Sequence, residues 1–211
     1  MAQVAAAMAS ADSTEGQASH AYHRAMTVQV VYETHSVTVD NETGRATGWL
    51  HGRLSDRGKI LAAELGKRRR NDKVSAVYTS DLGRAIETAE IAFGTTGIPI
   101  IREPRLRECN YGDMNGELRA VLDANGPQGV DQRYPGGESW REAVDRVTRF
   151  LEELASARDG ERVVTIGHMS ARFALESLDK GLPLDDVFRA PMDWQEGWEY
   201  RLSRNQSPSK Q

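Results

Sequence analysis

Residues Val28–Gly58 read VQVVYETHSVTVDNETGRATGWLHGRLSDRG, and this stretch decides the fold. It begins with a short β-branched run, Val28–Val31, which is typical of a buried parallel strand rather than a helix. His35 lies just beyond this run, and a turn-rich loop then leads to Ser55, which is suited to cap a helix. Because open α/β sheets bind their ligands at the carboxyl ends of strands, we expect His35 to lie at a binding edge.

The composition is that of an ordinary soluble protein. The chain has 211 residues, of which 39% are hydrophobic and 27% charged, so one domain with a sizeable core is expected. No apolar run approaches the roughly 20 residues of a membrane span, and the net charge of −4 argues against a general nucleic-acid binder. The single cysteine, Cys109, cannot form an internal disulfide, which is typical of a reducing compartment. We therefore expect a cytoplasmic protein that contacts neither membrane nor nucleic acid.

Strand and helix patterns alternate along the rest of the chain. Short apolar runs typical of strands recur at residues 74–78, 98–101, 162–166 and 197–202. Helical patterns follow the first and third of these runs, and Ser139 and Glu142 form a capping box before the clearest amphipathic helix. This alternation predicts an α/β fold, a three-layer α/β/α sandwich with a mostly parallel sheet.

The chain is interpreted as one catalytic domain, residues 27–204, with a short cap inserted at about 109–137. Residues 1–26 are rich in Ala, Ser, Gln and Gly and lack the basic and apolar parts of a secretory signal, so we expect a disordered extension. Residues 205–211 are expected to form a disordered tail.

Three polar side chains come just after predicted strands and are therefore expected at the same edge of the sheet: His35, Arg84 and His168. Right-handed crossovers make successive strands parallel, so these side chains are expected to meet. Two imidazoles, a guanidinium and a nearby carboxylate supply the nucleophile, the positive charge and the acid that phosphoryl transfer needs. The expected ligand is a small phosphorylated metabolite.

A set of short motifs carries a family resemblance. In chain order they are His35–Thr38 with Asn41, Leu54–Gly58, Tyr78–Ala85 with Thr88, Arg105–Glu108, Pro135–Ser139 and Gly167–His168. In this order the chain resembles the histidine phosphatase superfamily, with the phosphoglycerate-mutase-like fold, over roughly residues 27–202. The resemblance implies a phosphohydrolase that forms a phosphohistidine, and it leaves a mutase-type phosphotransferase as an alternative.

The resemblance also implies roles for individual residues. His35 matches the nucleophile, His168 the second histidine of the pocket, and Arg84 the arginine that clamps the phosphate. Glu108 matches the proton donor to the leaving group. Five further positions match or flank the phosphate site: Thr34, Ser36, Thr38, Asn41 and Met169. No metal and no organic cofactor are implied.

The chain departs from the family signature at its centre, where Arg-His-Gly is replaced by Thr34-His35-Ser36 and Ser-His-Gly by Gly167-His168-Met169. Thr34 supplies no charge, so we expect slower transfer, or an inactive descendant that binds a phosphorylated ligand or a protein partner. Arg45 or Arg172 would compensate if its side chain turned inward, and Arg45 is preferred because its loop should border the pocket.

The segment between Glu108 and Pro135 is short. Mutases of the resembling family carry a longer insertion there, so the short segment favours a phosphatase. The sequence leaves the oligomeric state open, with a homodimer allowed.

Overall fold

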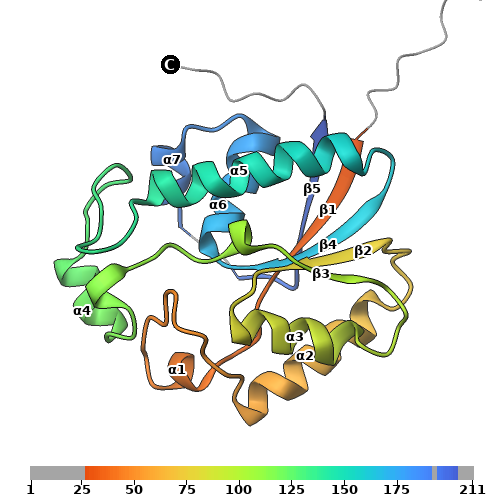
Figure 1. The fold of residues 1–211 in the computed structure, drawn as a ribbon, viewed down its shortest axis with the longest axis horizontal. Helices are drawn as coiled ribbons and strands as arrows, with labels where there is room; N and C mark the ends of the chain where they lie inside the picture. Colours follow the sequence, from red (N-terminus) through yellow and green to blue (C-terminus); the bar gives the residue numbers. More distant parts are fainter. Residues whose placement is uncertain (1–26, 192–193, 204–211) are drawn as a thin grey trace, which may run out of the picture.

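The computed structural model describes residues 27–191 and 194–203, which form a five-stranded sheet between two layers of helices (Figure 1). The extension and tail expected at 1–26 and 205–211 lie outside the described residues. The strands are β1 (Thr27–Thr34), β2 (Ala76–Thr79), β3 (Ile100–Arg102), β4 (Arg162–Gly167) and β5 (Trp198–Ser203). The α-helices are α1 (Val39–Glu42), α2 (Asp56–Arg69), α3 (Gly83–Phe93), α4 (Arg119–Asn125), α5 (Trp140–Ala157), α6 (Met169–Lys180) and α7 (Leu184–Arg189).

The strand order is β3-β2-β4-β1-β5, in which only β5 runs antiparallel to its neighbour. The prediction of an α/β fold with a mostly parallel sheet is confirmed. The chain after β1 leads to α2 on one face of the sheet, whereas the chain after the neighbouring β4 leads to α6 on the other face (Figure 1). Adjacent strands whose connections leave toward opposite faces create a crevice at their carboxyl ends, which is where such sheets bind ligands.

Both faces of the sheet are buried, which explains the nearly continuous apolar runs of the central strands. Val31, Val77 and Ile166 belong to the core beneath α2 and α3. Val30 and Tyr32 point to the opposite face and belong to the core beneath α5 and α6. This alternation along β1 follows from the two-residue period of a strand.

The predicted capping box begins α5, where Ser139 Oγ accepts from the Glu142 N–H and the Glu142 carboxylate accepts from the Ser139 N–H. The cap segment, residues 109–137, contains a 3-10 turn at Gly112–Met114 as well as α4. It is joined to the loop after α1 by main-chain hydrogen bonds, including Ala46 N–H to Glu117 O at 2.8 Å. Within the described ranges, no helix combines the length and apolar character needed to cross a bilayer.

Candidate active site

His35 and His168 are brought together by the pairing of β1 with β4. Thr34 is in register with Gly167, and the His35 N–H donates to Gly167 O at 3.1 Å. Each histidine is the next residue after its strand, so the two rings face one another with their centroids 5.0 Å apart. The register of β1 with β4 therefore places two imidazoles side by side at the crevice between the carboxyl ends of these strands.

The ring of His35 has a defined tautomer. Its Nδ1 lies 2.8 Å from the carbonyl oxygen of Ser36, which can only accept, so Nδ1 carries the hydrogen. Nε2 then presents its lone pair, and Arg84 Nε–H donates to it at 3.3 Å. The half-buried His35 thus offers a neutral nitrogen nucleophile that faces a guanidinium.

Arg84 is buried, with 2% of its surface exposed, and lies in the first turn of α3. Its terminal nitrogens donate to Gly48 O at 2.9 Å and to Leu50 O at 2.7 Å, both in the loop before α2. Gly48 has a φ of +55°, and a Cβ there would lie 1.9 Å from Asn115 Oδ1, so only glycine fits. The loop is shaped to hold the guanidinium beneath both imidazoles.

His168 is buried between Arg84 and Ser80. Arg84 donates from a terminal nitrogen to His168 Nδ1 at 3.3 Å, so Nδ1 is the acceptor in this arrangement. Nε2 therefore carries the hydrogen and donates to Ser80 Oγ at 2.7 Å. The lone pairs of both histidines point at the same guanidinium.

The electrostatic environment keeps both rings neutral. Burial, together with the charge of Arg84, lowers the pKa of His35 to about 3. Burial also holds the pKa of His168 well below its ordinary value, and Arg84 and His35 act in the same direction. At neutral pH the pair is therefore unprotonated, which is the state a histidine nucleophile needs.

Glu108 is buried at the N-terminus of α6. Its Oε1 accepts from the Cys109 N–H at 2.9 Å and the Ser170 N–H at 3.3 Å, while Oε2 accepts from the Met169 N–H at 3.3 Å. Met169 and Ser170 lie in the first turn of α6, so their N–H groups have no acceptor within the helix and are free to bond Glu108. His168 is the N-cap residue of the same helix, so Glu108 and the two imidazoles share one end of the sheet.

A neutral nucleophile, a buried cation and a carboxyl group are the groups that transfer of an anionic phosphoryl group requires. Comparison with known proteins agrees with this chemistry. A family model described as histidine phosphatase superfamily, branch 1, matches residues 34–201. The chain belongs to the histidine phosphatase superfamily.

Relatives within the superfamily carry both mutase and phosphatase names. A probable phosphoglycerate mutase, GpmB, of Erwinia tasmaniensis is 31% identical over 164 residues, which cover 74% of this chain and 76% of the relative. YhfR of Bacillus stearothermophilus superposes with a TM-score of 0.72 at 29% identity, covering 80% and 88% of the two chains. A mycobacterial glucosyl-3-phosphoglycerate phosphatase, solved as a complex with VO3, gives a TM-score of 0.67 at 27% identity, covering 77% and 85%.

Other residues that the superfamily resemblance selected lie around this centre in different ways. Thr38 and Asn41 form the capping box of α1, in which each side chain bonds the main chain of the other. Ser36 Oγ donates to Gly58 O at 2.7 Å, which ties the loop after β1 to the start of α2. Thr34 is half-buried at the end of β1, and Met169 contributes its N–H to Glu108. These contacts fix the loops around His35 and His168, while a role of these five residues in binding phosphate stays a prediction.

The two arginines considered as substitutes for the signature arginine have other partners. Arg45 is exposed and donates to Gly116 O at 2.9 Å. Arg172 lies over the ring of Trp198, 5.0 Å from its centroid. Among the described residues, neither guanidinium forms a hydrogen bond to His35 or His168, whereas Arg84 bonds both.

Ser80 contacts His168, and this contact was not predicted from the sequence. Serine and aspartate just before a helix are residue types suited to cap it, but α3 has Leu82 at its N-cap position and no side-chain cap. Ser80 instead binds His168, and Asp81 accepts from Arg107 Nε at 2.6 Å, a hydrogen bond that lowers the pKa of Asp81. No group of three His, Cys, Asp or Glu side chains suited to a metal ion occurs in the part of the chain that the structure describes.

Proposed function

We propose that this chain is a cytoplasmic phosphohydrolase that removes the phosphoryl group of a small phosphorylated metabolite through a phosphohistidine at His35. The observation that carries the proposal is the orientation of His35, whose Nδ1–H is bound to Ser36 O and whose Nε2 lone pair faces Arg84. This orientation leaves Nε2 unprotonated, so it can attack phosphorus in line once its hydrogen bond from Arg84 is exchanged for the phosphoryl group, and the same cation then stabilises the charge of the transferring group.

The reaction has two steps. In the first, His35 Nε2 forms a bond to phosphorus, the bond to the leaving oxygen breaks, and Glu108 supplies the proton that this oxygen takes. In the second, water attacks the phosphohistidine and gives a proton to Glu108, which restores the free imidazole and releases inorganic phosphate. Arg84 binds the equatorial oxygens in both steps, because its guanidinium already lies beside His35 Nε2, and His168 Nδ1 accepts from the same guanidinium.

Hydrolysis is favoured over mutase activity by the short segment between Glu108 and Pro135. A hydrolase releases phosphate from a monophosphorylated substrate alone, whereas a mutase of this type needs a bisphosphorylated sugar acid to prime its histidine. An absolute requirement for such a primer would replace the hydrolase assignment with the mutase assignment.

The deciding experiment compares wild type and His35→Ala on p-nitrophenyl phosphate and a panel of sugar phosphates. We expect the variant to lose about 10³-fold or more of the phosphate release, and quenched wild type to contain an acid-labile phosphate that the variant lacks. Equal release by both proteins would refute the phosphohistidine route.

A second candidate function is binding without turnover, and Thr34 is the observation that favours it. A half-buried hydroxyl stands where the family signature has an arginine. Absence of phosphate release above the His35→Ala background, together with tight binding of vanadate or a sugar phosphate by wild type, would favour this binder.

A further inference from the structure

The main chain around Glu108 is held by one side chain from the long helix α5. Arg146 donates from one terminal nitrogen to Arg105 O at 2.7 Å and to Arg107 O at 2.9 Å. Its other terminal nitrogen donates to Glu108 O at 3.0 Å. A single guanidinium therefore bonds three carbonyl oxygens of the segment that carries the carboxyl group.

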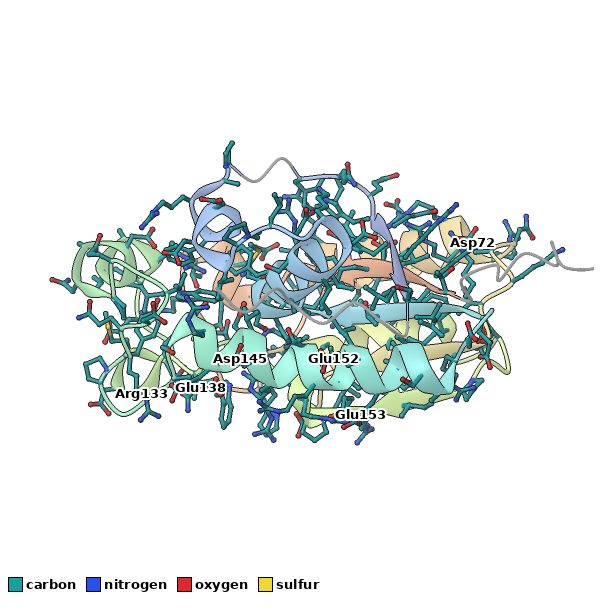
Figure 2. All side chains as sticks on the ribbon, turned by 90° about the horizontal axis from the view of Figure 1, so that it is seen from above. Asp72, Arg133, Glu138, Asp145, Glu152 and Glu153 are labelled. Carbon is teal, nitrogen blue, oxygen red and sulfur yellow. The ribbon has the colours of Figure 1, made fainter. Side chains whose placement is uncertain are left out.

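The guanidinium is itself fixed in orientation. Glu138 accepts from Arg146 Nε at 3.0 Å and from a terminal nitrogen at 2.8 Å, and the Arg146 side chain is only 13% exposed. Glu138 comes two residues before α5, the helix that carries Arg146, and Figure 2 shows it near the N-terminus of that helix. Glu138 also accepts from the Asn110 N–H at 3.0 Å. The Arg146–Glu138 ion pair therefore bonds the main chain both before and after Glu108.

A tryptophan side chain also bonds the Glu108 segment. Trp49 Nε1–H donates to Glu108 O at 2.6 Å, so this carbonyl accepts from Trp49 and Arg146 together. The Arg146 guanidinium also lies 5.8 Å from the centroid of the Trp49 ring. Trp49 lies between Gly48 and Leu50, whose carbonyls bind Arg84, so the loop that holds the cation is joined to the segment that holds the acid.

We propose that Arg146 is a positioning residue that holds the Glu108 segment against the N-terminus of α6, so that the Glu108 carboxyl group reaches the leaving oxygen. The inference rests on the proposed phosphohydrolase function. Arginine is the residue type that this role requires, because its planar fork serves several acceptors in fixed directions, whereas lysine is a flexible point charge. The 18-residue helix α5, closed by its capping box, supplies a rigid base for that fork.

The test uses the chemistry of the leaving group. p-Nitrophenolate departs without a proton, whereas an alkoxide from an alkyl phosphate such as glycerol phosphate requires one. The value of kcat/KM reports transfer to His35, the step in which the acid acts on the leaving oxygen. We expect Arg146→Met to lower kcat/KM about 10²-fold for glycerol phosphate and less than about threefold for p-nitrophenyl phosphate. Glu108→Gln should show the same selective loss, and Arg146→Lys should restore only part of it.

Arg158→Met is the matched control. Arg158 follows α5 and donates to Tyr78 and Glu161, with no hydrogen bond to the Glu108 segment among the described residues. We expect this control to retain both activities, and hydrogen exchange in the residue 105–110 amides to rise in Arg146→Met but not in the control. If Arg146→Met does not fold, Arg146→Lys carries the same substrate comparison.

Loss of equal size on both substrates, or no loss on either, would overturn the positioning role while leaving the hydrolase assignment intact. A wild type without turnover of either substrate would overturn the proposed function and the positioning role together. The two failures are therefore distinguishable.

Discussion

Ser80 Oγ lies 2.7 Å from His168 Nε2, although 88 positions separate the two residues in the chain. Both side chains are buried, so no water replaces this contact if the hydroxyl is lost. The serine accepts the Nε2 hydrogen and thereby leaves Nδ1 of the imidazole to face Arg84. The tautomer of the second histidine is thus set by a serine whose place before a helix would locally suit a cap.

Replacement of this hydroxyl, Ser80→Ala, leaves the His168 Nε2–H buried without an acceptor. We expect the free energy of unfolding to fall by about 1–3 kcal/mol and kcat/KM to fall about tenfold, measured by urea denaturation and phosphate release. Ser75→Ala is the control, because Ser75 is exposed and bonds Glu161 instead. A Ser80→Ala protein with wild-type turnover would show that the tautomer of His168 does not limit the rate.

Arg84→Lys tests the buried cation. Lysine keeps the charge but cannot reach Gly48 O, Leu50 O and both imidazoles in one plane. Because the buried carbonyl oxygens would lose their hydrogen-bond donors, the free energy of unfolding should fall by about 2–4 kcal/mol. Turnover should fall about 10²-fold or more. Denaturation curves and kcat/KM on p-nitrophenyl phosphate provide the readouts. Wild-type values for both would mean that charge alone suffices at this position.

Thr34→Arg restores the charge of the family signature at the end of β1. A second guanidinium beside the transferring group should raise kcat/KM about tenfold, because charge-assisted hydrogen bonds stabilise the transition state. Thr34→Met, which adds bulk without charge, separates the electrostatic effect from a steric one. A rate no higher than that of Thr34→Met would show that the pocket is adapted to a single guanidinium.

The two neutral histidines also predict how stability changes with pH. The pKa of His35 is about 3 in the folded protein and about 6.5 in an unfolded chain, so the unfolded state binds more protons between these values. Stability is therefore full above about pH 6.5 and falls as the pH decreases toward 3. We expect His35→Gln to lose less stability than wild type between pH 7 and pH 5, measured by urea denaturation at each pH. His168→Gln should change the slope in the same direction, and identical slopes in all three proteins would contradict the assignment.

Much of the fold was predictable because its signals are local. The capping box at Ser139 and Glu142 and the β-branched runs of the central strands depend on residues a few positions apart, and the structure contains the helix and strands they indicate. The short helices α1 and α7 were not predicted, since four and six residues carry too little periodicity. The meeting of His35 and His168 followed from parallel topology alone.

The contacts that were not predicted all join distant segments. The hydroxyl of Ser80 could cap a helix locally or bind His168 at a distance, and the register of β2 with β4 decides between these two uses. Arg45 was preferred as a compensating charge because of its place in the loop, but its guanidinium is directed to Gly116 O. The role of Arg146 had no sequence signal either, because its acceptors are main-chain oxygens that any residue type provides.

The saturation of Arg84 has a consequence for product release. Each of its three guanidinium nitrogens already has an acceptor in the protein, so free inorganic phosphate gains only the difference between old and new hydrogen bonds. In the proposed reaction, the carbonyls and imidazoles would bond the guanidinium again once the phosphohistidine is hydrolysed, and this would favour departure of the anion. Under the proposed hydrolase function we therefore expect weak retention of the product, so that high concentrations of free phosphate should inhibit turnover little.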